Sequence, residues 1–289
     1  MAARRPAAVR IVTDSAARLP RAWAEANGVI ILPHRVRFGA DCYQEDVDLN
    51  EAELAVKASR AKQPFDVEAP SVEEFARAYE LLAHSRAEVI SIHIASPLSQ
   101  TVQHALQARQ PFLGQCEIHI LDSQTMAMGL NALVQAAITL AKRNLPAMEI
   151  VTRLRGLMQD AFGIFISDDM AYLQHSKRLR PAQALLGEML QVVPCLSIEQ
   201  GDLIAAEKVR SFERGIERIV EFASEFEEDA QFAIVQLSPH PNERTQALAE
   251  ALREVFPKIQ RFPVQTCGAA VGRIIGPRGI GLMIYEGKV

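Results

Sequence analysis

The sequence predicts an α/β protein of two domains: an N-terminal domain with a mostly parallel, Rossmann-like sheet and flanking helices, and a C-terminal α/β domain with a mixed sheet. In the first half, apolar β-branched runs alternate with helical patterns, and small polar residues follow each run. In the second half, two strand patterns meet at a tight turn, which indicates a hairpin. The chain of 289 residues is long for one core. We therefore expect domains at residues 1–160 and 161–289.

The first domain begins with a strand over residues 10–12 that leads into small polar residues. Residues 29–38 form a second strand region, which Pro33 interrupts, and residues 39–50 have the composition of an acidic loop. The run 71–74, Ser-Val-Glu-Glu, is a capping box, and apolar residues at helical spacing follow it. A helix is therefore expected from that point.

The stretch 89–101 organises the first domain. Residues 89–94 are an apolar run that predicts the central strand, a cluster of small hydroxyl residues comes next, and apolar residues at helical spacing then begin. In an open parallel sheet, ligands bind at the carboxyl ends of the strands, where a helix N-terminus offers unpaired N–H groups. Such a site suits an oxyanion, meaning a carboxylate or a phosphate. A further strand at 117–121 and two more helices complete the domain.

The second domain is expected to begin near residues 158–164. Its predicted strands are 163–166, 192–198, 203–209, 231–237, 258–264 and 281–285. Its predicted helices include a short one at 168–176, an amphipathic one at 216–226 and a third at 248–255.

Several function classes are disfavoured. The formal net charge of −4, without interleaved basic and aromatic residues, argues against nucleic acid as a partner. The longest apolar runs are shorter than the ~20 residues that span a bilayer, so no transmembrane segment is expected. Four widely spaced cysteines predict reduced thiols and a cytoplasmic protein. Scattered histidines predict no metal site, and no glycine-rich nucleotide loop occurs.

Polar residues at the predicted strand ends of the first domain form the candidate site. They are Thr13, Asp14, Ser15, Ser96, Ser99, Thr101, Asp122 and Ser123. Because carboxyl ends of parallel strands share one edge, these residues are expected to converge on an interdomain cleft. Serine and threonine are also common caps and turn residues, which is the alternative for each. A triad of Ser96, His93 and Asp14 or Asp122 is a further alternative, although no GxSxG elbow accompanies it.

A specific succession of short motifs runs along nearly the whole chain. The motifs are Val12-Thr13-Asp14-Ser15, Ile90-Ser91-Ile92-His93-Ile94-Ala95-Ser96, Leu121-Asp122-Ser123 and Gly276-Pro277. In order and spacing this succession resembles the DegV family. The resemblance implies a protein that holds one long-chain fatty acid, such as palmitate or oleate, with the carboxylate at the cleft and the acyl chain in an apolar tunnel of the N-terminal domain.

The resemblance also implies a binding protein and not an enzyme, with no cofactor besides the bound fatty acid. It implies a fatty-acid kinase as a partner, and Arg178 and Arg210 match positions at the kinase-facing surface. Two other readings remain open: a small-molecule kinase or hydrolase that uses the same cleft, and a lipid-free regulatory module.

The chain departs from the family pattern at the polar end of the site. Val67 stands where the family has a carboxylate-binding threonine, Ala95 where it has the first of two serines, and Ile274 where it has a histidine. Arg278 stands where a glycine is usual. We therefore expect Ser96 and Arg278 to hold the carboxylate beside Ala95, because a guanidinium pairs a carboxylate bidentately. Three alternatives stay open: another lipid, the absence of phosphotransfer, and an Arg278 that points into solvent.

Overall fold

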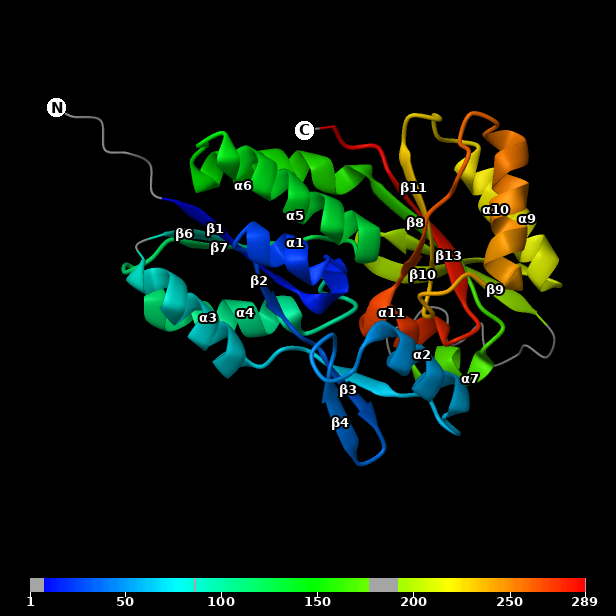
Figure 1. Ribbon diagram of the computed structural model, residues 1–289, viewed down its shortest axis with the longest axis horizontal. Helices are drawn as coiled ribbons and strands as arrows, with labels where there is room; N and C mark the ends of the chain where they lie inside the picture. Colours follow the sequence, from blue (N-terminus) through cyan, green and yellow to red (C-terminus); the bar gives the residue numbers. More distant parts are fainter. Residues whose placement is uncertain (1–7, 86, 177–191, 289) are drawn as a thin grey trace.

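Two sheets with flanking helices organise the computed structural model, which describes residues 8–85, 87–176 and 192–288 (Figure 1). The first sheet is parallel, with strand order β2 (Ile30–Leu32), β1 (Val9–Asp14), β6 (Glu88–His93) and β7 (Ile118–Asp122). The second is mixed, with order β10 (Asp202–Val209), β9 (Val193–Glu199), β8 (Ala161–Ile166), β13 (Ile280–Tyr285), β11 (Gln231–Gln236) and β12 (Val264–Thr266). The predicted fold class is confirmed.

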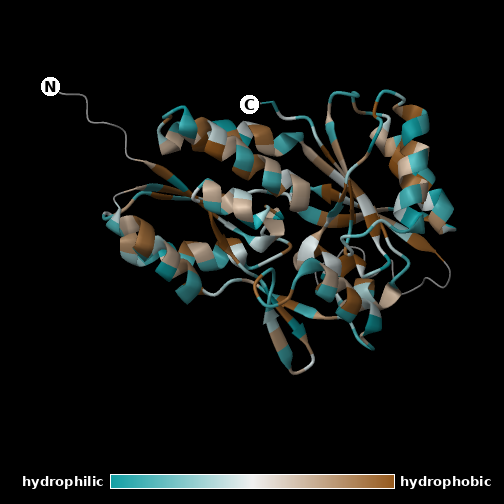
Figure 2. Ribbon diagram, in the orientation of Figure 1, coloured by the Kyte–Doolittle hydropathy of each residue, from teal (hydrophilic) through white to brown (hydrophobic). Residues whose placement is uncertain are grey.

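Helices cover both faces of the parallel sheet. Figure 1 shows α5 (Ala127–Lys142) and α6 (Ala147–Leu157) above it, and α3 (Val72–His84) and α4 (Thr101–Arg109) below it. Because side chains alternate along a strand, neighbouring residues serve different cores. Ile90 and Ile92 pack with α5 and α6, whereas Val89 packs with α3. Hydrophobic residues accordingly concentrate on the strands (Figure 2).

Local sequence signals set several of these elements. Ser71 and Glu74 form the expected reciprocal capping box at the start of α3. β9 and β10 form the predicted antiparallel hairpin, which turns at Gly201. The helices of the second half include α7 (Met170–His175), α9 (Phe212–Ala223) and α10 (Glu243–Val255).

Two predicted segments are wrong. Residues 39–50 are not simply a loop, because β4 (Asp41–Gln44) pairs with β3 (Arg35–Phe38), which also pairs with β5 (Asp66–Glu68) in a small antiparallel sheet. The strand expected over 258–264 begins only at Val264, because Pro263 has no N–H for a sheet ladder.

Three helices and a short helical turn are additions to the prediction. α2 (Glu51–Arg60) begins at a capping box of Asn50 and Glu53. α11 (Gly268–Ile275) contains two glycines and is a poor helix former by composition, yet seven of its residues are buried. A 3-10 turn, Ser15–Ala17, follows β1 directly, and α1 (Arg21–Ala26) comes after it.

The two sheets share packing. One cluster of buried side chains includes Ile90 of the parallel sheet, Phe165 and Met283 of the mixed sheet, and Ile274 of α11. The division at residue 160 therefore stays a prediction. In the part of the chain that the structure describes, no helix is both long and apolar enough to cross a bilayer.

Candidate functional site

Asp14, at the end of β1, anchors a buried polar network. Its Oδ2 accepts hydrogen bonds from Nδ1 of His93 at 3.0 Å and from the Ile94 N–H at 3.1 Å. The other ring nitrogen of His93 lies 2.6 Å from Ser91 Oγ, which lies 2.8 Å from the hydroxyl of Tyr79. All four side chains are fully buried.

The electrostatics of this network favour an ionised Asp14. Burial alone would raise the pKa of Asp14, but the hydrogen bond from His93, the electrostatic influence of the two nearby imidazoles and the Ile94 N–H outweigh it and hold the pKa below its ordinary value. An ionised carboxylate only accepts, so His93 donates from Nδ1 and its Nε2 accepts from Ser91.

The order Asp14, His93, Ser91 has the appearance of a catalytic triad, but its geometry argues against hydrolysis. The serine is Ser91 and not the expected Ser96, and Ser91 has no exposed surface. A substrate carbonyl therefore has no route to this hydroxyl. The network instead ties β1 to β6 through polar groups.

Several predicted site residues serve as turn and cap residues. Thr13 Oγ1 donates to the carbonyl of Ile92, and the hydroxyl of buried Ser123 donates to the carbonyl of Thr125. Asp122 accepts from the N–H of Ser96, whose side chain is exposed. Ala95 is fully buried beneath this turn. The local capping alternative accounts for Ser123 and for the Gln124 N–H that Asp122 also accepts, whereas the bonds of Thr13 and of the Ser96 N–H join separate segments of the sheet.

A second buried network starts at Ser15 and joins two further predicted site residues, Ser99 and Thr101. The Ser15 hydroxyl donates to Glu45 Oε2 at 2.6 Å and lies 2.9 Å from Nδ1 of His34. Nε2 of His34 lies 3.4 Å from Ser99 Oγ and 3.3 Å from Thr101 Oγ1. His34 and Glu45 are functional candidates that the sequence reasoning missed, because a single histidine inside a strand pattern has no distinctive spacing.

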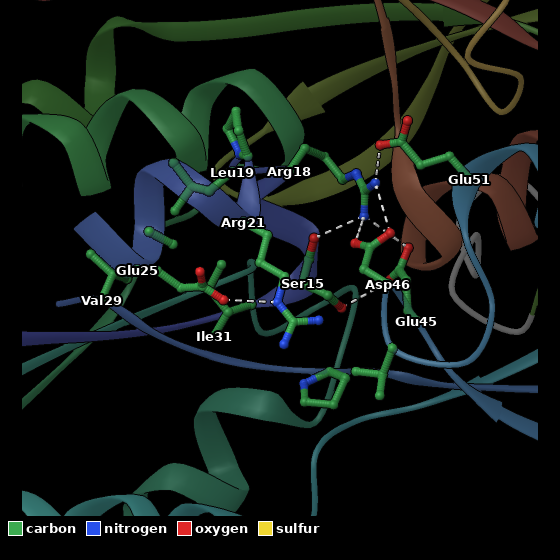
Figure 3. Close-up of a pocket in the computed structure, with 14 residues that line it drawn as sticks. Ser15, Arg18, Leu19, Arg21, Glu25, Val29, Ile31, Glu45, Asp46 and Glu51 are labelled. Carbon is green, nitrogen blue, oxygen red and sulfur yellow. Dashed lines mark hydrogen bonds and ion pairs between the residues drawn. The ribbon is translucent and has the colours of Figure 1, made fainter. Parts of the chain in front are cut away.

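An apolar pocket of about 610 Å3 lies on one side of this second network (Figure 3). Apolar side chains of α1, β2 and the segments beside them supply much of its lining: Leu19, Ala24, Val29, Ile31 and Pro33. Ser15 and Glu45 stand at its polar side, and Figure 3 shows Arg18 reaching toward Glu45, Asp46 and Glu51 there. We call this cavity the apolar pocket.

The Arg18 cluster closes the polar side of the apolar pocket. Arg18 is largely buried and pairs with Glu45 at 3.2 Å, with Asp46 at 2.6 Å and with Glu51. Burial would lower the pKa of Arg18, but these three carboxylates raise it above its ordinary value. Arg18 Nε also donates to Thr266, so the cluster links the N-terminal half to the segment before α11.

A smaller pocket of about 300 Å3 lies beside the turn between β6 and α4, and we call it the arginine pocket. Arg35 and Arg273 both line it, together with Ser99, Gln100 and Val67. Arg273, on α11, donates to the carbonyl of Leu98 at 3.2 Å across 175 positions of sequence. The pocket therefore joins a C-terminal helix to the central turn. No local pattern marks Arg273, which the sequence reasoning also missed.

The arginines that the sequence analysis named, Arg278 and Arg210, do not line the arginine pocket. Arg278 is more than half exposed, pairs with Asp168 at 3.3 Å and donates to the Asp168 carbonyl. Arg210 is exposed after β10, and Arg178 lies outside the described residues. Ile274 is fully buried in the shared core. Among the described residues, no group of three His, Cys, Asp or Glu is arranged to hold a metal ion.

The β9–β10 hairpin reaches the central turn at Gly201. Its φ is +87°, and an added Cβ would lie 3.0 Å from the Ala95 Cβ and 3.1 Å from the Gln124 Cα. Gly114 has a similar φ of +80° but nothing within 4 Å. We expect Gly201→Ala to lower the free energy of unfolding by about 1 kcal/mol more than Gly114→Ala does, measured in urea. Equal losses would show that Gly201 serves backbone conformation alone.

Comparisons with known proteins agree over the length of the chain. The family model described as "Uncharacterised protein, DegV family" matches residues 8–287. A DegV domain-containing protein of Streptomyces coelicolor is 30% identical over 277 residues, which cover 96% of this chain and 98% of that protein.

Solved structures show the same similarity. A DegV family protein from Thermus thermophilus, described by its fatty acid binding, has a TM-score of 0.83 and 26% identity and covers 96% of this chain and 99% of that one. DegV of Bacillus subtilis, described as a fatty acid binding protein, has a TM-score of 0.84 and 25% identity and covers 97% of this chain and 100% of that one. The similarity thus includes both sheets.

Proposed function

The chain belongs to the DegV family, and from this premise we propose that it binds a long-chain fatty acid such as palmitate or oleate. The carboxylate lies in the arginine pocket, and the acyl chain extends into the N-terminal half, to the apolar pocket. The observation that carries this proposal is the pair of neighbouring cavities of opposite character, in a fold shared with fatty-acid-binding proteins.

The charges of the two pockets support this orientation. The arginine pocket is lined by Arg273, by Arg35, which pairs with Glu74 at 2.9 Å, and by one carboxylate, Glu68, which Arg37 pairs at 3.0 Å. The apolar pocket is lined by two arginines and four carboxylates, so a second anion there would meet repulsion. A fatty-acid carboxylate therefore prefers the arginine pocket, where Arg273 can pair with it.

The apolar pocket has the size that a lipid tail requires. Its volume of about 610 Å3 falls within the range of small-molecule sites. Burial of a sixteen-carbon tail at ~0.8 kcal/mol per CH2 contributes about 11 kcal/mol before the costs of ordering. The polar end need only orient the carboxylate, so the loss of family hydroxyls at Val67 and Ala95 is compatible with binding.

The chain acts in this proposal as a binding protein that presents its ligand to a partner kinase. The exposed position of Arg210 after β10 is compatible with contact to such a partner, and we assign Arg178 the same role. The alternative of catalysis by the chain itself has no favourable observation, since the Asp14 network is closed to substrates.

Ligand retention tests the proposed function. Purified protein, delipidated and then mixed with an equimolar set of palmitate, oleate, hexadecan-1-ol and octanoate, should retain the two long-chain acids in preference to the alcohol and to octanoate after gel filtration. Mass spectrometry of the organic extract measures the retained species, and serum-free buffer passed over the same column is the blank. Retention of none of the four, by folded protein, would contradict the proposal and favour the lipid-free regulatory reading.

A further inference from the structure

His34 stands between the two pockets. Each of its two sequence neighbours lines one of them: Pro33 lines the apolar pocket, and Arg35 lines the arginine pocket. The imidazole itself is fully buried. One ring nitrogen contacts Ser15, which lines the apolar pocket, and the other contacts Ser99, which lines the arginine pocket. The ring therefore lies across the direct path from one cavity to the other.

Hydrogen bonds hold the ring in that position. Ser15 donates its only hydroxyl proton to Glu45, so Nδ1 of His34 carries the proton and donates to Ser15. Nε2 is then an acceptor for a hydroxyl proton of Ser99 or Thr101, which lie 2.7 Å apart. The His34 N–H also donates to Ser15 Oγ at 3.0 Å. Displacement of the imidazole would leave buried polar groups without partners, which is unfavourable.

We propose that His34 determines which acyl chain lengths this protein selects, an inference that rests on the proposed function. An acid whose tail ends in the arginine pocket binds without disturbing the ring. A longer tail reaches the apolar pocket only by displacing the imidazole and breaking its hydrogen bonds. Affinity should therefore rise with each added CH2 until the tail meets His34 and then stop rising. Only tails long enough to fill the apolar pocket bury enough surface to offset the broken hydrogen bonds.

Substitution of the ring separates this role from a structural one. Removal of the barrier in His34→Ala should raise the ratio of palmitate affinity to octanoate affinity about tenfold or more, because a long tail no longer breaks the ring's hydrogen bonds. His34→Phe keeps a ring of similar size but none of these hydrogen bonds, so its ratio should also rise, by less than in His34→Ala because the bulk of the ring remains. Titration calorimetry with saturated acids from octanoate to stearate measures these ratios.

His93→Ala is the matched control. His93 is as buried as His34 and also bonds two side chains, but those partners, Ser91 and Asp14, line neither pocket, whereas Ser15 and Ser99 do. It should lower stability and leave the affinity ratio unchanged. Should His34→Ala not fold, His34→Ser, which keeps a hydroxyl for Ser15 or Ser99, takes its place with the same expected ratio.

The outcomes distinguish the two proposals. An affinity ratio that is equal in wild type and in the small-residue variants, with acids bound by all, would overturn the role of His34 and leave fatty-acid binding intact. An equal rise of the affinity ratio in His34→Ala and His93→Ala would overturn that role as well, since a general loss of packing would then explain the rise. Absence of binding by every folded variant and by wild type would overturn both proposals.

Discussion

Arg273→Ala should weaken palmitate binding by about 2–4 kcal/mol, roughly 30- to 900-fold in affinity. Arg273 lines the arginine pocket and holds its guanidinium near the β6–α4 turn by a hydrogen bond to the Leu98 carbonyl. A charge in a partly buried cavity is screened less than a surface charge, so its removal leaves the carboxylate without its principal counter-ion. Titration calorimetry on delipidated protein measures the change.

Arg278→Ala is the control for this substitution. Its guanidinium is more than half exposed and already pairs with Asp168, so palmitate affinity should change by less than about 0.5 kcal/mol. Hexadecan-1-ol has no charge and should bind wild type and Arg273→Ala with equal affinity. A large loss of palmitate affinity in Arg278→Ala, with none in Arg273→Ala, would contradict this prediction and show that Arg278 pairs with the carboxylate.

Asp14→Ala should lower the free energy of unfolding by about 3–5 kcal/mol. The substitution removes the acceptor for His93 and for the Ile94 N–H inside a fully buried region, and it also removes the acceptor for the Ala16 N–H. Donors left unpaired away from water carry their full desolvation cost. Asp14→Asn keeps one acceptor oxygen and should lose less. Urea unfolding, followed by circular dichroism, gives both values.

Low pH should remove the stabilising contribution of Asp14 from the wild-type protein. The folded-state pKa of Asp14 lies below its ordinary value of 3.8, so its stabilising effect is complete above that value and is lost as the pH falls through the folded-state pKa. The difference in stability between wild type and Asp14→Ala should therefore shrink below about pH 4. The pair of Asp229 with Lys288 also lowers the pKa of Asp229, but the pair is exposed, so Asp229→Ala should show a much smaller difference across the same pH range. A gap that is constant down to strongly acidic pH would contradict an ionised Asp14.

Short-range patterns carry much of the fold. The alternation in 89–94 and the capping box at Ser71 each depend on residues within one strand or one helical turn, so their periodicity is readable without a structure. The same holds for the capping signal of Asn50 and Glu53, which marks α2 although the prediction did not include that helix. α11 differs, because its glycines disfavour a helix locally and only its burial compensates.

The sequence by itself determined the α/β class, the mostly parallel arrangement of the first sheet and the polar character of the strand ends, because these follow from residue type and spacing along the chain. Only the tertiary structure decided which polar residues meet. His93 meets Ser91 and Asp14, the latter across 79 positions, and Arg273 meets the carbonyl of Leu98 across 175. Such contacts depend on the direction in which packed helices and strands hold their side chains, and no local pattern specifies that direction.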